Sequence, residues 1–253
     1  MADSPLPLNN NENAGLQGGV SINATPGEPY GTIRGTDYIY DDSGNKVVGS
    51  NGYYLTTPNS NEIIGNILPE WTGGVQNTFQ YKNLSLGFLI DVQKGGDIFS
   101  LDTWYGQATG VYDQSVGTND LGNPMRNTLA NGGGIVLPGV NENGEPNSTR
   151  ADFSTYANPY GYARDANAGH VYDASFVKLR EANLTYAFGE EMIDRLPFTR
   201  ASVSLIGRNI WIIHKNIPYS DPESGLSAGN VQGYQSGAYP TFREIGASLK
   251  LNF

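Results

Sequence analysis

Residues 84–93 read LSLGFLIDVQ, and they carry the clearest structural signal in the chain. Apolar residues occupy every second position of this stretch, and most of the positions between them are small or polar. The apolar positions are Leu84, Leu86, Phe88, Ile90 and Val92. A period of two places these side chains on one face of a β-strand. About nine residues of such alternation match the length of a strand that crosses a bilayer at a tilt.

The same alternation recurs on both sides of this stretch and ends on the last residue, Phe253. It predicts five strands, at residues 73–81, 84–94, 175–188, 200–214 and 240–253. In the fourth strand, one face carries Ala201, Val203, Leu205, Gly207, Asn209, Trp211 and Ile213. In the last strand, the apolar face carries Ile245, Ala247, Leu249, Leu251 and Phe253. The sequence therefore predicts an all-β chain with antiparallel strands.

The segments between these strands alternate between long and short. Residues 95–174 and 215–239 show little periodicity and are rich in Gly and Asn, so we expect long loops there. The connectors at 82–83 and 189–199 are short. Residues 1–29 are expected to be loop or disordered. Residues 30–58 offer two further short strands around a turn at Asp41-Asp42-Ser43-Gly44-Asn45.

Composition excludes several classes of protein. The net charge is -10 and the pI about 4.6, which argues against nucleic-acid binding. The chain has no Cys and two His, so thiolate or His-based metal sites and cofactor sites are not expected. Asp221, Glu223 and the Asp41-Asp42 pair lack the EF-hand spacing, and turn chemistry explains them better than calcium. No nucleophile elbow or triad accompanies His170 or His214, so we expect no enzyme activity.

Alternation alone also fits a soluble β-sandwich, whose outer faces meet water. Three features together favour a membrane barrel over a sandwich or a fibrous repeat. The connections are asymmetric in length, aromatic residues such as Trp71, Tyr81 and Trp211 gather near strand ends, and the chain stops on an apolar-face aromatic residue. The side chains expected to face lipid are Leu84, Leu86, Phe88, Ile90, Leu184, Tyr186, Val203 and Leu205.

Short motifs in a fixed order resemble the late-barrel region of SusC/RagA-type TonB-dependent transporters over residues 25–253. They are Pro26-Gly27-Glu28-Pro29-Tyr30-Gly31, Ile64-Gly65-Asn66, Pro69-Glu70-Trp71, residues 73–83, residues 171–181 with Leu184-Thr185-Tyr186, Gly207-Arg208-Asn209, Asp221-Pro222-Glu223, Tyr239-Pro240-Thr241-Phe242-Arg243 and Phe253. Each motif alone is weakly specific, whereas their common order and spacing make the set specific.

The resemblance implies a 22-stranded barrel with an internal plug in the bacterial outer membrane. Members of this family import glycans or peptides with energy relayed by TonB, and a SusD-like surface lipoprotein covers the barrel. Residues 30–253 would then be the C-terminal part of the barrel. The signal peptide, the TonB-contacting segment and the plug are not found in the sequence and would lie before residue 1. Alone, such a segment is not expected to transport. The alternative is a secreted, β-rich glycan-binding or adhesive module.

This family interpretation gives the predicted side chains their roles. The last strand, with Ile245, Ala247, Leu249, Leu251 and Phe253, resembles the signal that the barrel-assembly machinery reads. Lys178, Arg180, Arg208, Trp104 and Tyr105 could contact substrate or lid, although structural charge pairs and loop packing explain them more simply. Lys178 and Arg180 share the parity of Leu184 and Tyr186, so we expect them on the same face, above the lipid boundary. Other loop aromatics, Tyr112, Tyr156, Tyr160 and Tyr162, could stack on sugar rings.

Overall fold

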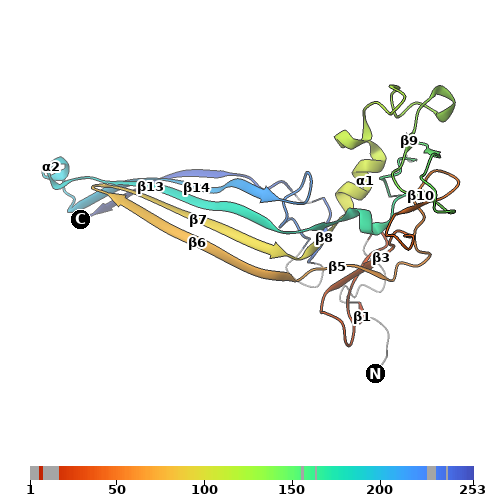
Figure 1. Cartoon of the computed structure of the whole chain (residues 1–253). Helices are drawn as coiled ribbons and strands as arrows, with labels where there is room; N and C mark the ends of the chain where they lie inside the picture. Colours follow the sequence, from red (N-terminus) through yellow and green to blue (C-terminus); the bar gives the residue numbers. More distant parts are fainter. Residues whose placement is uncertain (1–5, 8–16, 155–156, 163, 227–231, 238) are drawn as a thin grey trace. The chain divides into compact units, whose positions relative to one another are not determined.

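The computed structural model describes residues 6–7, 17–154, 157–162, 164–226, 232–237 and 239–253, and it divides into two compact units (Figure 1). Each unit is assembled from three segments of the chain. Unit 1 comprises Met1–Leu68, Gly96–Tyr172 and Gly225–Ala238, and unit 2 comprises Pro69–Gly95, Asp173–Ser224 and Tyr239–Phe253.

Unit 2 is a five-stranded antiparallel sheet in the order β16-β14-β13-β7-β6 (Figure 1). Its strands are β6 (Pro69–Tyr81), β7 (Leu84–Gly95), β13 (Phe176–Ala187), β14 (Arg200–Lys215) and β16 (Glu244–Asn252). The five predicted strands are confirmed, with ends that shift by a few residues. The short helix α2 (Glu190–Ile193) lies in the connector between β13 and β14. Lys82, with φ of 52°, adopts the left-handed conformation in the tight turn between β6 and β7.

Strand register places the predicted apolar positions opposite one another. Leu184 in β13 pairs with Leu86 in β7 and with Leu205 in β14, and Leu205 pairs with Ala247 in β16. Directly paired residues in an antiparallel sheet project from the same face. The alternation within each strand therefore becomes one continuous apolar face across the sheet. We call it the apolar face, and the opposite surface the polar face.

A β-bulge in β13 changes the face on which two predicted residues lie. Leu179 and Glu181 pair with the consecutive β7 residues Ile90 and Leu89, so Arg180 is an extra residue in β13. Beyond a bulge of this kind, odd-numbered and even-numbered residues of the strand exchange faces of the sheet. The prediction that Lys178 and Arg180 lie on the face of Leu184 and Tyr186 is therefore wrong, because both belong to the polar face.

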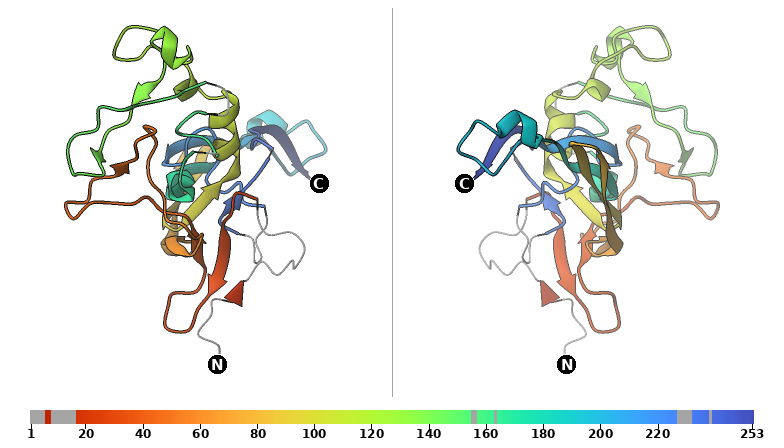
Figure 2. Two further views of the ribbon diagram at one scale, coloured as in Figure 1. Left: turned by 90° about the vertical axis from the view of Figure 1, so that its right-hand side faces the viewer. Right: turned by 90° about the vertical axis from the view of Figure 1, so that its left-hand side faces the viewer.

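The described residues of unit 1 form short strands in four small sheets, together with one α-helix and three 3-10 turns. Figure 2 shows the strands β2 and β3 side by side from two opposite directions. The sheets are β1-β2-β3-β5, β10-β4, β11-β9 and β12-β8-β15. The elements are β1 (Leu6–Pro7), β2 (Ser21–Ala24), β3 (Thr32–Gly35), β4 (Val47–Val48), β5 (Glu62–Asn66), β8 (Asp97–Ser100), α1 (Leu101–Thr109), η1 (Asp113–Ser115), η2 (Leu129–Asn131), β9 (Ile135–Val136), β10 (Val140–Asn141), β11 (Arg150–Ala151), η3 (Asn167–His170), β12 (Val171–Asp173) and β15 (Tyr234–Gln235).

The organisation of unit 1 differs from three sequence expectations. Residues 95–174, expected to be one long loop, instead contain α1 and much of a packed unit. Strand β2 lies within residues 1–29, which were expected to be loop or disordered. The turn at Asp41–Asn45 is confirmed by the Asp41 N to Asn45 O hydrogen bond of 2.9 Å, but its flanking strands belong to unit 1 and add nothing to the five-stranded sheet.

Two hydrophobic clusters and a capped helix hold unit 1 together. One cluster comprises Val20, Ile22, Ile33, Ile67, Phe99, Leu101 and Tyr234. The other comprises Tyr38, Val48, Tyr54, Leu137 and Ala166. Helix α1 begins after Ser100, whose hydroxyl accepts a hydrogen bond from Thr103 N at 3.1 Å. It ends at Gly110, whose φ of 78° is the left-handed conformation that glycine adopts most readily.

Candidate functional site

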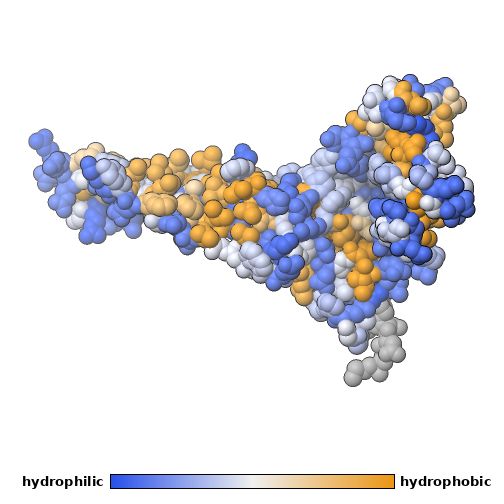
Figure 3. Space-filling model, in the orientation of Figure 1, coloured by the Kyte–Doolittle hydropathy of each residue, from blue (hydrophilic) through white to orange (hydrophobic). Residues whose placement is uncertain are grey.

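The apolar face of unit 2 is exposed along the strands. Leu86, Leu205 and Leu249 are 43, 55 and 64% exposed, and they come from three different strands. Figure 3 shows hydrophobic residues gathered over the strands of unit 2, with hydrophilic residues around α2 at one end. All eight residues predicted to face lipid lie on this face by register. An exposed apolar surface of this breadth is characteristic of a surface that meets another apolar phase or a partner.

The polar face of the same sheet is hydrogen-bonded between strands. Thr185 Oγ1 and Ser204 Oγ lie 2.8 Å apart across β13 and β14. Arg208 Nε donates to Glu181 Oε2 at 3.4 Å, and both side chains are largely solvated. Gly87 leaves space for Asn183, because a Cβ at Gly87 would meet the Asn183 amide at 2.9 Å. These contacts support the structural interpretation of Arg208.

An ion cluster on the polar face accounts for Lys178 and Arg180. Lys178 Nζ donates to Asp221 Oδ1 and to Glu223 Oε2. Arg180 donates to Glu223 Oε1 and, from Nε, to Asp91 Oδ2 at 2.8 Å. The side chains of Lys178 and Asp221 are only 6% and 8% exposed. The cluster therefore fastens the segment after β14 to β13, rather than leaving these two cations free for a ligand.

The acidic motif that supplies this cluster is also a turn. Asp221 Oδ1 accepts the backbone N–H of Glu223 at 2.9 Å, and Ser224 Oγ donates to Asp221 O at 2.6 Å. Burial opposes ionisation of Asp221, but hydrogen bonds from Lys178 and Thr241 outweigh it and lower the pKa of that carboxyl. Within the described residues, no group of three or more acidic or His side chains is placed to hold a metal ion.

The last strand lies at the edge of the sheet with its apolar residues on the apolar face. Ile245, Leu249 and Phe253 are 81, 64 and 82% exposed. Ala247 and Leu251 pair with Leu205 and Ala201 of β14. The Phe253 ring lies 5.2 Å from that of Phe198, edge to face. The geometry agrees with the alternation read from the sequence, and the assembly-signal role stays a prediction.

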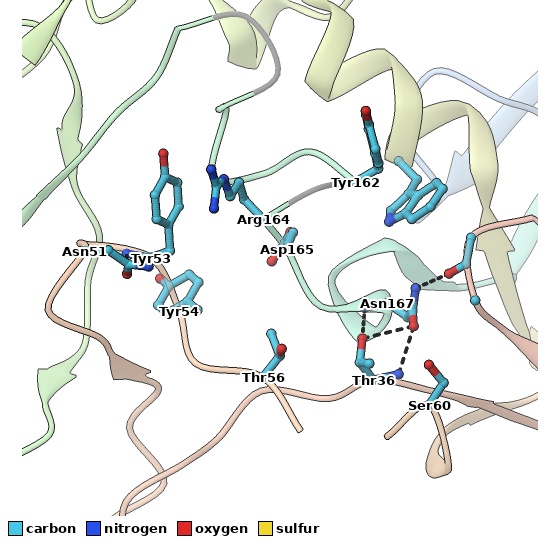
Figure 4. A pocket seen from close by; sticks show the side chains of 13 residues that line it. Thr36, Asn51, Tyr53, Tyr54, Thr56, Ser60, Tyr162, Arg164, Asp165 and Asn167 are labelled. Atoms are coloured by element: carbon cyan, nitrogen blue, oxygen red, sulfur yellow. Dashed lines mark hydrogen bonds between the residues drawn. The ribbon is translucent and has the colours of Figure 1, made fainter. Parts of the chain in front are cut away.

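A cavity of about 450 Å³ lies in unit 1, and none of its lining residues belongs to a β-strand of that unit. Figure 4 shows Arg164 between Tyr53 and Tyr162, with Asp165 beside it. The lining residues are Gly18, Gly19, Thr36, Asn51, Tyr53, Tyr54, Thr56, Ser60, Trp104, Tyr162, Arg164, Asp165 and Asn167. Trp104 and Tyr162 were singled out from the sequence. Tyr53, Tyr54 and Arg164 were not, because no local pattern shows which loops meet.

Aromatic rings gather beside this cavity. The Trp104 ring lies 5.1 Å from that of Tyr105 and 5.3 Å from that of Tyr162, both nearly edge to face. Tyr105 is 40% exposed. Tyr160 packs against the second hydrophobic cluster, as expected for loop packing, and Tyr112 is partly buried. Tyr156 lies outside the described residues.

A buried polar network lies beneath the cavity. Tyr38 Oη donates to Asp165 Oδ1 at 2.7 Å, and His170 Nε2 lies 3.5 Å from Asp165 Oδ2. Burial raises the pKa of Asp165 to about 6, although the hydrogen bond from Tyr38 opposes that rise. Burial lowers the pKa of His170 to about 3, so the imidazole is neutral at pH 7. His170 is thus a packed core residue.

None of the helices among the described residues is long and apolar enough to cross a membrane. The chain matches no protein-family model.

Curated relatives come from Formosa agariphila. TonB-dependent receptor P26 is 24% identical over 216 residues, which cover 83% of this chain and 20% of that receptor. TonB-dependent receptor P39 is 27% identical over 223 residues, which cover 87% of this chain and 19% of that receptor. The chain therefore spans about a fifth of the length of the curated relatives it matches. Both are named as receptors and neither as an enzyme, in keeping with the expected lack of catalysis.

Solved structures of the RagAB peptide importer share the fold. In its closed-closed state the TM-score is 0.56 at 19% identity, over 95% of this chain and 24% of the importer chain. In its open-open state the TM-score is 0.55 at 19% identity, with the same coverage. Sequence identity this low supports a likeness in fold alone. Together with the receptor matches and the two-faced antiparallel sheet, these likenesses support the interpretation of the chain as a part of a SusC/RagA-like TonB-dependent receptor.

Proposed function

We propose that the chain is part of an outer-membrane, TonB-dependent importer of oligosaccharides or peptides that works with a SusD-like surface lipoprotein. The observation that carries the proposal is the two-faced sheet. Its apolar face is exposed on three or more strands, and its polar face is held by inter-strand hydrogen bonds. This is the arrangement of a barrel wall between lipid and an aqueous interior. The secreted-module alternative gives no role to so wide an exposed apolar face.

The ends of the sheet fit this orientation. The β6–β7 turn at Lys82 and the α2 connector lie at one end, where Thr199 N also donates to Asn252 O at 2.7 Å. Short connections of this kind are periplasmic in outer-membrane barrels. The segment after β14, which carries Asp221 and Glu223, belongs to the other end. We place that end on the extracellular side, where substrate and lid would meet the barrel.

The sheet edges argue that transport needs more than these strands. β6 and β16 are the outer strands of the sheet, and each is exposed along almost its whole length. In hydrocarbon, an unpaired edge leaves backbone groups unsatisfied, at several kcal/mol each. We therefore propose that β6 and β16 pair with further strands in a working transporter, and that the chain alone does not transport. The barrel-assembly machinery and TonB would be partners of that complete transporter.

Single-cysteine labelling tests the barrel-wall proposal directly, because the chain has no Cys of its own. Cysteine would be placed at Leu86, Leu205 or Leu249 of a complete transporter that contains the chain, reconstituted in phospholipid vesicles. We expect a lipid-soluble maleimide to label these sites at least several-fold faster than a charged, water-soluble one. The physical reason is that all three side chains belong to the apolar face and are largely exposed.

Each labelling site has a matched control one residue away on the polar face. These are Ser85, Ser204 and Ser248, whose cysteine variants should show the opposite probe preference. Equal labelling of both sets by the charged probe would reject the lipid-facing role. Protection of the three apolar sites from both probes would indicate that another protein layer covers them, as in a soluble module.

The terminal residue gives a second test. In a complete transporter, Phe253→Ala is expected to lower the amount of folded protein in the outer membrane several-fold, because it removes the last apolar side chain of β16. The measurement is the heat-modifiable barrel band from isolated outer membranes. Phe242→Ala is the matched control, since Phe242 is also exposed at 72% but precedes β16. Unchanged levels for Phe253→Ala would contradict an assembly signal.

A further inference from the structure

The cavity of unit 1 has spare hydrogen-bond donors, and its one acidic lining residue already accepts hydrogen bonds from the protein. Among its lining residues, Asp165 is the only acid, and its carboxylate already accepts from Tyr38 Oη and from Ala166 N at 3.0 Å. Asn167 uses both ends of its amide, accepting from Thr36 and donating to Gly18 O. The Tyr54 hydroxyl donates to Pro138 O at 2.9 Å. The groups left over for a ligand are therefore N–H donors and the hydroxyls of Thr56, Ser60 and Tyr162, which can donate or accept.

Arg164 is the first of these donors. It is exposed at the cavity, and its guanidinium carbon lies 4.8 Å from the centre of the Tyr53 ring. No described carboxylate lies within ion-pairing distance of it. Stacking on Tyr53 holds the guanidinium plane in place and leaves its N–H groups available, and a guanidinium is the side chain best suited to bind a carboxylate through two hydrogen bonds.

Trp104 is the second donor. Its indole N–H is buried and has no hydrogen-bond partner among the described residues. A buried N–H without a partner carries a desolvation penalty of about 1–3 kcal/mol, which a bound acceptor would relieve. Trp104 also lines the cavity with Tyr162, so the same wall offers flat aromatic surfaces.

The cavity wall suits a sugar better than an extended peptide. A peptide is commonly held by adding to a free strand edge, and none of the lining residues belongs to a β-strand of the structure. A pyranose ring instead presents C–H groups that stack on aromatic rings and hydroxyl groups that accept hydrogen bonds. The cavity volume of about 450 Å³ lies within the usual range for small-molecule sites.

We propose that this cavity binds an acidic oligosaccharide, with a uronate carboxylate on Arg164 and a sugar ring against the aromatic wall of Trp104 and Tyr162. This inference rests on the proposed import function, because it names a substrate class for that importer. The anionic ligand would approach a chain of net charge -10, so the unpaired arginine supplies the local attraction that the whole molecule lacks.

Calorimetric titration of the full chain in detergent with trigalacturonate tests the proposal. We expect trigalacturonate to bind at least tenfold more tightly than the neutral trigalactoside of the same linkage. Arg164→Gln should remove most of that difference and leave the weak binding of the neutral sugar unchanged. Trp104→Phe keeps an aromatic ring but removes the N–H, and it should weaken trigalacturonate binding several-fold. Arg195→Gln is the matched control, since it removes an exposed arginine outside the cavity and should change nothing.

Several results would overturn the proposal. The first is that trigalacturonate does not bind, and the second is that the neutral trisaccharide binds as tightly as trigalacturonate. The third is that Arg164→Gln and Arg195→Gln weaken trigalacturonate binding to the same extent. Triglutamate carries the same number of side-chain carboxylates without sugar rings. If triglutamate bound as tightly as trigalacturonate, the cavity would be a peptide site instead. Cysteine labelling of the sheet is independent of these titrations. Lipid-facing labels without acidic-sugar binding would reject only the ligand, whereas the reverse would reject the membrane role.

Discussion

Lys178→Met is expected to lower the free energy of unfolding of the chain by about 3–5 kcal/mol, the usual loss when one partner of a buried ion pair is removed. Lys178 is buried and bonds to both Asp221 and Glu223. Without it, the Asp221 carboxylate stays 8% exposed with no cation in contact among the described residues. Urea unfolding of the chain in detergent, followed by Trp fluorescence, gives the change in free energy.

A matched variant separates burial from charge in this experiment. Arg208→Gln breaks the pair with Glu181 on the same face of the sheet, but those side chains are 62% and 39% exposed. Exposed pairs contribute about 0–1 kcal/mol, so this variant should be nearly neutral. The double variant Lys178→Met with Asp221→Asn should recover part of the lost free energy of unfolding, because the buried Asp221 carboxylate is then replaced by a neutral amide. A loss for Lys178→Met no larger than that for Arg208→Gln would show that the cluster does not fasten the segment to β13.

The strands of unit 2 were predictable because their signal is local. Each has apolar side chains at every second position, and the long regular runs in β7 and β16 need no tertiary information to be recognised. The face of Lys178 and Arg180 was not predictable in this way. It depends on one extra residue in β13, and that bulge is defined only by which residues of β7 lie opposite.

The strands of unit 1 could not be predicted from the sequence for a related reason. Its strands are two to five residues long, too short to show a period, and several of them pair with partners far away in the sequence. β8 pairs with β15, for example, through Phe99 and Tyr234. The cavity could not be predicted either, because Tyr53 and Arg164 come from loops more than a hundred residues apart. Composition indicated aromatic loops, whereas only the fold shows that an unpaired arginine lies among them.

Leu205→Arg is expected to destabilise the sheet in phospholipid vesicles by about 2–4 kcal/mol, the measured range for a cation on the lipid face of a barrel near the bilayer midplane. Leu205 lies near the middle of β14, between Leu184 and Ala247 on the apolar face, and it is 55% exposed. In a water-soluble sheet, arginine at so exposed a position would cost little. The size of the loss therefore reports whether lipid covers this face. Urea unfolding of a complete transporter in vesicles measures this loss of free energy.

Ser204→Arg is the control, because Ser204 precedes Leu205 and projects from the opposite face. It loses the contact with Thr185 Oγ1, for which a loss of about 1 kcal/mol is expected. The difference between the two variants should disappear in urea titrations without lipid or detergent, where neither face meets hydrocarbon. A larger loss for Ser204→Arg than for Leu205→Arg in vesicles would mean that the two faces have been assigned the wrong way round. Similar losses for both would mean that neither face of the sheet meets lipid.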